Sequence, residues 1–234
     1  MFIINTVKYF FQAMIVYFFF IIIKIIGLNL SRKFFSFLFN KIGPSMKSEE
    51  TIDNNLEKFL GFFNDNEKKD IKFKMWANYG KTFVEYLYLK KFRNANYHIE
   101  IKGDQILNKL IKKNKPIIFV SGHFANFELM SMMLTKKNIN LATIYRPLNN
   151  FFLNPFMEYL RRKYICKNQI KKGLVGVKDS IKYIKNNFSI ALMIDQRVSE
   201  GKKLPFFGSM AFTTTLPAQM ALKFNLDIVP IYIS

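Results

Sequence analysis

From residue 97 onward, short apolar runs alternate with amphipathic stretches, and this alternation is the feature that most restricts the fold. The apolar runs predict strands and the amphipathic stretches predict helices. The expected strands are 97–103, 116–122, 140–147, 189–196 and 227–234, and the expected helices are 104–114, 127–138, 151–164, 176–187 and 215–225. An alternation of this length predicts an α/β fold with a central, largely parallel sheet flanked by helices.

The segment 10–30 is almost entirely apolar and is about as long as a helix that crosses a bilayer. Gln12 interrupts its apolar run near one end and Lys24 near the other, where a lysine can snorkel to the interface. Basic residues are denser after the segment than before it, which puts the body of the protein on the cytoplasmic side. A buried core helix and a helix that lies in the interface are the alternatives.

Three regions are therefore expected: a membrane anchor at 1–30, a helical segment at 31–96, and an α/β domain at 97–234. Ser48 is a candidate N-cap in the helical segment, and the polar stretch 64–70 is expected to interrupt it. The chain ends inside an apolar run, so we expect the domain to be incomplete at its C-terminal end.

The formal net charge of +20 comes mostly from lysine. It indicates either a biased genome or a basic surface for anionic partners, such as membrane headgroups or an acidic carrier protein. The sequence has no signature of a nucleic-acid-binding module, so no nucleic acid is expected as a partner. The single Cys166 excludes an intramolecular disulfide and a cysteine-rich zinc site.

Polar clusters follow three of the expected strands: Ser121-Gly122-His123, Tyr145-Arg146-Pro147 and Asp195-Gln196-Arg197. In open α/β sheets, ligands bind beyond the carboxyl ends of the strands. The three clusters together therefore predict a site at that edge of the sheet.

Glu128 follows His123 by five residues. On one helix the two side chains would point roughly 140° apart, so they can meet only if His123 lies in the turn before the helix. Asn126 is then a plausible cap, and a carboxylate on the imidazole would leave its other nitrogen free to act as a general base on a hydroxyl. The alternative is a histidine that caps the helix while Glu128 is solvated.

The motifs resemble one known family. The stretch "SGHFANFE" resembles the His-x4-Asp/Glu motif of glycerolipid-type acyltransferases, and its aromatic and asparagine residues are closer to the bacterial lipid A late acyltransferases. "YRPLNN", "LMIDQ", and "LPFFG" followed by "TTTLPAQMAL" resemble further blocks of that family in the same order. The resemblance extends over nearly the whole chain.

The resemblance implies transfer of an acyl chain from an acyl-carrier-protein thioester, or acyl-CoA, to a hydroxyl of a phosphorylated lipid A precursor. His123 would be the base and Glu128 its partner. The substrate-binding residues would be Asn126, Arg146, Asp195, Gln196 and Arg197. No metal, other cofactor or covalent acyl-enzyme is implied, and the location would be the cytoplasmic face of the inner membrane.

Two other functions remain open: a lysophospholipid or glycolipid acyltransferase, and a non-catalytic membrane-bound binder of lipid or carrier protein. Arg197 stands where the family often has an acid, and Ala125 where glycine is common. Arg161 and Arg162 are expected on a solvated or headgroup-facing side of their helix, and His98 is expected to be structural.

Overall fold

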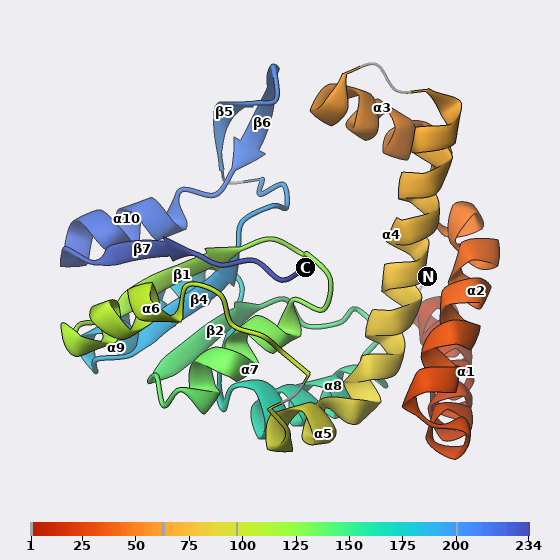
Figure 1. The fold of residues 1–234 in the computed structure, drawn as a ribbon, viewed down its shortest axis with the longest axis horizontal. Coiled ribbons are helices and arrows are strands. Elements are labelled where there is room, and N and C mark those ends of the chain that lie inside the picture. The colour runs from red at the N-terminus through yellow and green to blue at the C-terminus, as the bar shows by residue number, and fades with distance from the viewer. Residues whose placement is uncertain (1, 62–63, 97, 200) are drawn as a thin grey trace.

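The computed structural model describes residues 2–61, 64–96, 98–199 and 201–234. Five parallel strands form a central sheet in the order β3-β2-β4-β1-β7, and an antiparallel hairpin, β5–β6, projects from the body (Figure 1). The strands are β1 (Ile117–Ser121), β2 (Leu141–Tyr145), β3 (Asn168–Lys171), β4 (Ser189–Met193), β5 (Lys202–Phe206), β6 (Ser209–Thr213) and β7 (Asp227–Pro230). The α/β class with a parallel sheet, predicted from the alternation, is confirmed.

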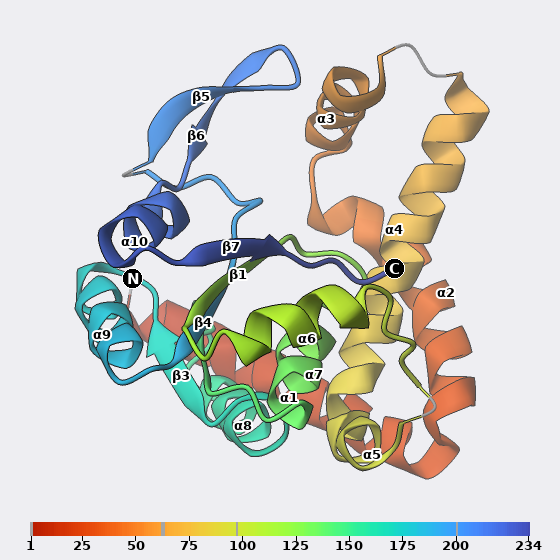
Figure 2. The same cartoon turned by 60° about the vertical axis from the view of Figure 1, so that its left-hand side comes forward.

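Some helices cover the sheet, and others form a separate group beside it (Figure 2). They are α1 (Phe2–Ile26), α2 (Leu28–Met46), α3 (Glu49–Leu60), α4 (Asp65–Glu85), α5 (Leu89–Asn94), α6 (Asp104–Lys112), α7 (Glu128–Lys136), α8 (Asn154–Leu160), α9 (Leu174–Lys185) and α10 (Leu216–Phe224). A 3₁₀ turn, η1 (Tyr86–Tyr88), follows α4, and a π-helical turn, η2 (Arg161–Ile165), continues α8.

The centre of the sheet is covered on both faces, and successive residues of a strand point to opposite sides, so they join different core clusters. In β1, Ile117 and Phe119 belong to the larger core cluster with α7 and α8, whereas Ile118 and Val120 belong to a second cluster with α9 and α10. All five residues of β1 are buried. This explains why the strand reads as an uninterrupted apolar run.

In the helical region, the expected N-cap is confirmed, and the boundary between two helices differs from the expected one. Ser48 caps α3 by accepting a hydrogen bond from the Thr51 amide at 3.3 Å. The expected interruption is present but lies earlier than 64–70: α3 ends at Leu60, and Asn64 and Glu67 form a capping box that begins α4 at Asp65. A polar stretch of this kind has the composition of a helix start as well as that of a loop.

Three further differences concern local structure. Residues 98–103 are irregular rather than the expected strand, with a turn at His98 and bends at 102 and 103, and Tyr97 lies outside the described residues. The strands β3 and β5–β6 were not predicted, because they are short and polar or partly exposed. Thr215 stands just before α10, where the sequence favours a threonine N-cap, but its side chain makes no capping hydrogen bond.

Candidate active site

The sheet register brings His123 and Asp195 together. In the β1–β4 pair, Ser121 lies beside Met193, so His123 and Asp195 each lie two residues beyond paired positions. Both therefore leave the sheet at its carboxyl edge, where the sequence analysis placed the site. Residues 72 positions apart in the chain become neighbours through strand pairing alone.

His123 and Asp195 form two hydrogen bonds. The His123 ring Nδ1 lies 2.7 Å from Asp195 Oδ1, and the His123 backbone amide donates to Oδ2 at 2.7 Å. Gly122 makes this approach possible: a Cβ there would lie 3.2 Å from Asp195 Oδ2 and 2.9 Å from the Phe124 ring. The carboxylate thus fixes both the backbone and the ring of His123.

The electrostatics of Asp195 favour its charged form. Burial opposes that charge, but the hydrogen bonds from the His123 ring and amide outweigh it, so the pKa of Asp195 lies below its ordinary value. An ionised Asp195 accepts from Nδ1–H, which leaves His123 Nε2 as the free nitrogen that can accept a proton. Gln196 places its Nε2 3.5 Å from His123 Nε2, beyond a normal hydrogen-bond length.

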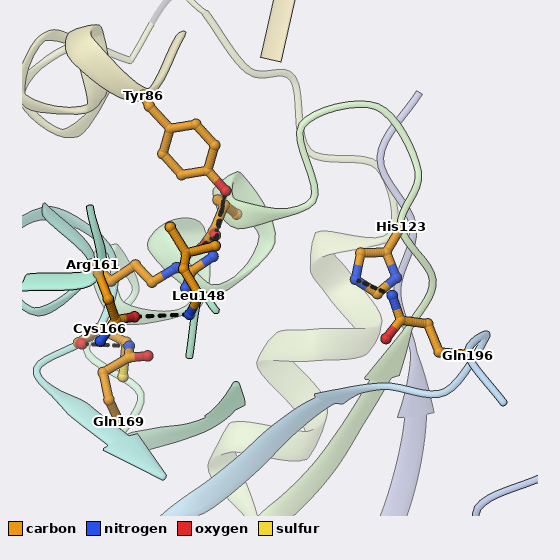
Figure 3. A network of polar contacts seen from close by, with 9 residues as sticks. Tyr86, His123, Leu148, Arg161, Cys166, Gln169 and Gln196 are labelled. Carbon is orange, nitrogen blue, oxygen red and sulfur yellow. Dashed lines mark hydrogen bonds and ion pairs between the residues drawn. The ribbon is translucent and has the colours of Figure 1, made fainter. Parts of the chain in front are cut away.

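The expected pairing of His123 with Glu128 is wrong. Glu128 Oε1 instead accepts from Arg161 Nε at 2.8 Å, from Arg161 Nη2 at 2.6 Å and from the Tyr86 hydroxyl at 2.7 Å. Figure 3 shows Tyr86 and Arg161 on one side of the view, and His123 with Gln196 on the other. Two separate polar groups therefore stand where the sequence predicted one dyad.

The physical reason for this difference is burial. Glu128 and Arg161 keep only 8% and 10% of their side-chain surface exposed. A carboxylate at that depth needs a counter-ion, and Arg161 supplies one. The His123 imidazole, in turn, is already hydrogen-bonded to Asp195. Burial, followed by the Glu128 charge, raises the pKa of the Tyr86 phenol, so Tyr86 remains a neutral donor. Glu128 does begin α7, as the predicted geometry required.

The remaining predicted substrate-binding residues have different positions. Asn126 is buried and donates to Glu85 Oε2 at 2.7 Å, so it ties the turn before α7 to α4. Arg146 lines the cavity described below, and no ion pair or side-chain hydrogen bond to it is found among the described residues. The Arg197 guanidinium packs over the Phe212 ring of β6 at 5.3 Å. Of the predicted substrate-binding residues, Arg146 and Gln196 therefore line the cavity.

A cavity of about 820 Å³ opens beside His123. Its wall includes Glu128 and Arg161 from the buried cluster, Arg146 and Lys172 from the loops after β2 and β3, and Gln196. Apolar side chains make up much of the rest of its lining: Phe127, Met130, Ile144, Leu148, Leu174, Val177, Leu192, Met193 and Leu216. Such a cavity can hold a long apolar chain beside a polar reacting centre.

Sequence reasoning missed Tyr86 and Arg161. Arg161 was expected on a solvated face, but it is buried and lines the cavity. In the sequence, its burial could have been inferred only from its position next to the apolar face of an amphipathic helix. Within the described part of the chain, no group of three or more His, Cys, Asp or Glu residues is arranged to hold a metal ion.

An imidazole held by a carboxylate at a strand end, beside a largely apolar cavity, is an arrangement suited to general-base catalysis. The chain matches the family described as bacterial lipid A biosynthesis acyltransferase over residues 4–234, and it belongs to that family. Comparison with curated proteins gives no match.

Proposed function

We propose that the protein transfers an acyl chain from a thioester to a hydroxyl of a lipid A-type glycolipid, with His123 as general base and Asp195 as the residue that orients it. The observation that carries this proposal is the 2.7 Å contact between His123 Nδ1 and Asp195 Oδ1 at the cavity, in a chain of this acyltransferase family. Asp195 thus takes the part that the motif spacing had suggested for Glu128.

In the proposed reaction, His123 Nε2 removes the proton of the acceptor hydroxyl as its oxygen attacks the thioester carbonyl. A tetrahedral intermediate forms, the carbon–sulfur bond breaks, and the proton on Nε2 passes to the departing thiolate. The products are an ester and a free thiol, so no proton or electron is left over. The ionised Asp195 stabilises the imidazolium between the two proton transfers.

The acceptor is proposed to carry phosphate. Arg146 and Lys172 both line the cavity, and neither side chain has an acidic partner among the described residues. Unpaired cations beside a reacting centre favour an anionic substrate group, and a guanidinium binds phosphate in bidentate fashion. A glycolipid without phosphate would leave both charges unmatched.

The donor is proposed to be an acyl-carrier-protein thioester, with acyl-CoA as the alternative. The net charge of +20 suits an acidic protein partner. The apolar helix α1 and the many exposed lysines support a location at the cytoplasmic face of the inner membrane. The lysophospholipid acyltransferase and the non-catalytic binder are disfavoured by the family match.

Mass spectrometry of lipid A tests the proposal. Cells that lack an endogenous late acyltransferase should gain lipid A species heavier by one acyl chain when the intact gene is expressed. The His123→Ala variant, at an equal protein level by immunoblot, should yield none of this gain. An unchanged lipid A profile with the intact gene, accompanied by acylation of a phospholipid, would favour the lysophospholipid acyltransferase instead.

A further inference from the structure

The helix α1 is docked lengthwise on the body of the protein. Near its N-terminal end, Asn150 Nδ2 donates to the Tyr9 carbonyl at 2.8 Å. In its middle, the Tyr17 hydroxyl donates to the Phe152 carbonyl at 3.0 Å. Near its C-terminal end, the Tyr88 hydroxyl donates to the carbonyl of the fully buried Ile23 at 3.0 Å.

Aromatic side chains extend this contact along the helix. Phe10 packs on Phe152, and Phe20 packs on both Phe83 and Phe156, with ring centroids 5.3 to 5.7 Å apart. Lys24 also turns toward the protein: its ammonium donates to the Leu87 carbonyl at 2.7 Å. The lysine expected to snorkel to the interface therefore holds α1 against the body.

The opposite face of α1 is apolar and uncovered. Eight large apolar residues on it have exposed fractions from 49% to 77%: Ile4, Val7, Phe11, Met14, Ile15, Phe18, Ile21 and Ile25. At about 100° per residue they fall within an arc of roughly 120°, the width of the apolar face of an amphipathic helix. Lys8 and Gln12 are exposed next to one edge of this face.

The length of α1 conflicts with a helix that crosses the bilayer while docked. Its 25 residues are about 37 Å long, enough to span. Contacts with the body extend at least from Tyr9 to Lys24, so no more than residues 2–8 could extend beyond them, about 10 Å of a hydrocarbon core that is about 30 Å thick. A docked, spanning α1 would carry the body into the hydrocarbon.

We propose that α1 lies in the plane of the membrane interface, with its exposed apolar face in the lipid and its other face on the protein. The occupant of the apolar face is thus an anionic bilayer rather than a second copy of the chain. The charge supports this choice: Lys8 on α1 and Lys33, Lys41 and Lys47 after it are exposed. The proposal rests on the proposed membrane location and not on the proposed reaction.

This orientation would bring the active-site cavity to the bilayer surface. Asn150, which holds Tyr9, follows Leu148 and Asn149 in the loop that lines the cavity. The exposed Phe151 in the same loop packs on Tyr9 with ring centroids 5.9 Å apart. One loop therefore separates α1 from the cavity, so a lipid acceptor could reach His123 without leaving the interface.

Cysteine labelling in spheroplasts tests the orientation. Asn5→Cys reports the start of α1, and Lys178→Cys reports the exposed surface of α9 on the body. The unchanged chain gives the blank, because its Cys166 is buried. Each variant is treated with a membrane-impermeant maleimide before and after the spheroplasts are broken without detergent.

An in-plane α1 predicts that both cysteines lie on the same side: neither is labelled in intact spheroplasts, and both are labelled after breakage. Labelling of Asn5→Cys alone in intact spheroplasts would show a spanning helix and overturn the proposal. Recovery of the protein in the soluble fraction would overturn both the orientation and the membrane location. Dimers cross-linked through Asn5→Cys in place of membrane binding would assign the apolar face to a second copy.

Discussion

At the scale of single residues, the carboxylates of Asp195 and Glu128 have different environments. Asp195 is 38% exposed at its side chain and is bonded to an imidazole, whereas Glu128 is 8% exposed and is bonded to a guanidinium. We infer that Asp195 orients the base and that Glu128 is a positioning residue, which fixes Arg161 in the cavity wall. Removing the Asp195 carboxylate and removing the Glu128 carboxylate should therefore have different main effects.

Replacing Glu128 should mainly affect stability. Glu128→Gln leaves the buried Arg161 without its counter-ion, and the free energy of unfolding should fall by about 3 kcal/mol, the lower end for a broken buried pair. Glu57→Gln is the control, because Glu57 forms an exposed pair with Lys68 and should change stability by less than about 1 kcal/mol. Urea titration of the purified variants measures both. Unchanged stability with lost turnover would instead make Glu128 part of the catalytic machinery.

Replacing Arg146 should affect acceptors according to their phosphate. Arg146→Ala should lower kcat/KM for a phosphorylated acceptor far more than for the dephosphorylated one, and Arg146→Lys should give a smaller loss because it keeps the charge without the fork. Arg162→Ala is the control, since Arg162 is exposed and does not line this cavity. Kinetics on the paired acceptors give the ratio, and equal losses on both would reject a phosphate contact.

At the scale of secondary-structure elements, α2 and α4 pack closely because each places a glycine against the other. Gly43 of α2 lies under the Trp76 ring of α4, and Gly80 of α4 lies against the Phe35 carbonyl of α2. A Cβ at Gly80 would lie 2.3 Å from the Phe35 carbonyl oxygen, which is backbone and cannot move aside. This contact sets where α4 places Glu85, which Asn126 and Arg32 both bind.

Replacing Gly80 should therefore be unfavourable although it lies inside a helix. In an exposed helix, Gly→Ala stabilises by about 1 kcal/mol, but Gly80→Ala should lower the unfolding free energy by about 1–3 kcal/mol through overpacking. Lys81→Ala, at the exposed neighbouring position, should stay within about 0.5 kcal/mol. Thermal melts of the two variants and the unchanged protein compare their stabilities. A stabilised Gly80→Ala would show that α2 and α4 are farther apart in solution.

At the scale of the whole molecule, the sequence predicted the parallel sheet and the sheet edge beside which His123 and Asp195 meet. Short uninterrupted apolar runs mark buried strands such as β1 and β4, and polar residues after them mark the sheet edge. Local spacing could not give the partner of His123, because Glu128 is near in sequence while Asp195 is near only through the pairing of β1 with β4. It also could not show that Arg161 is buried, since that depends on where α8 packs.

The central claim is that His123 and Asp195 form the acid–base group of an acyltransferase, and the kinetics of Asp195→Asn test it most directly. Asparagine keeps the size of the side chain but cannot stabilise an imidazolium. The control is Asp179→Asn, the same change at an exposed carboxylate on α9.

Turnover should be measured on purified full chain in detergent, with an acyl-carrier-protein thioester and a phosphorylated glycolipid acceptor. The account predicts that Asp195→Asn lowers kcat on the order of 10²–10⁴-fold with the protein folded, while Asp179→Asn stays within threefold of the unchanged enzyme. Turnover of Asp195→Asn within about threefold of the unchanged enzyme would contradict the assignment.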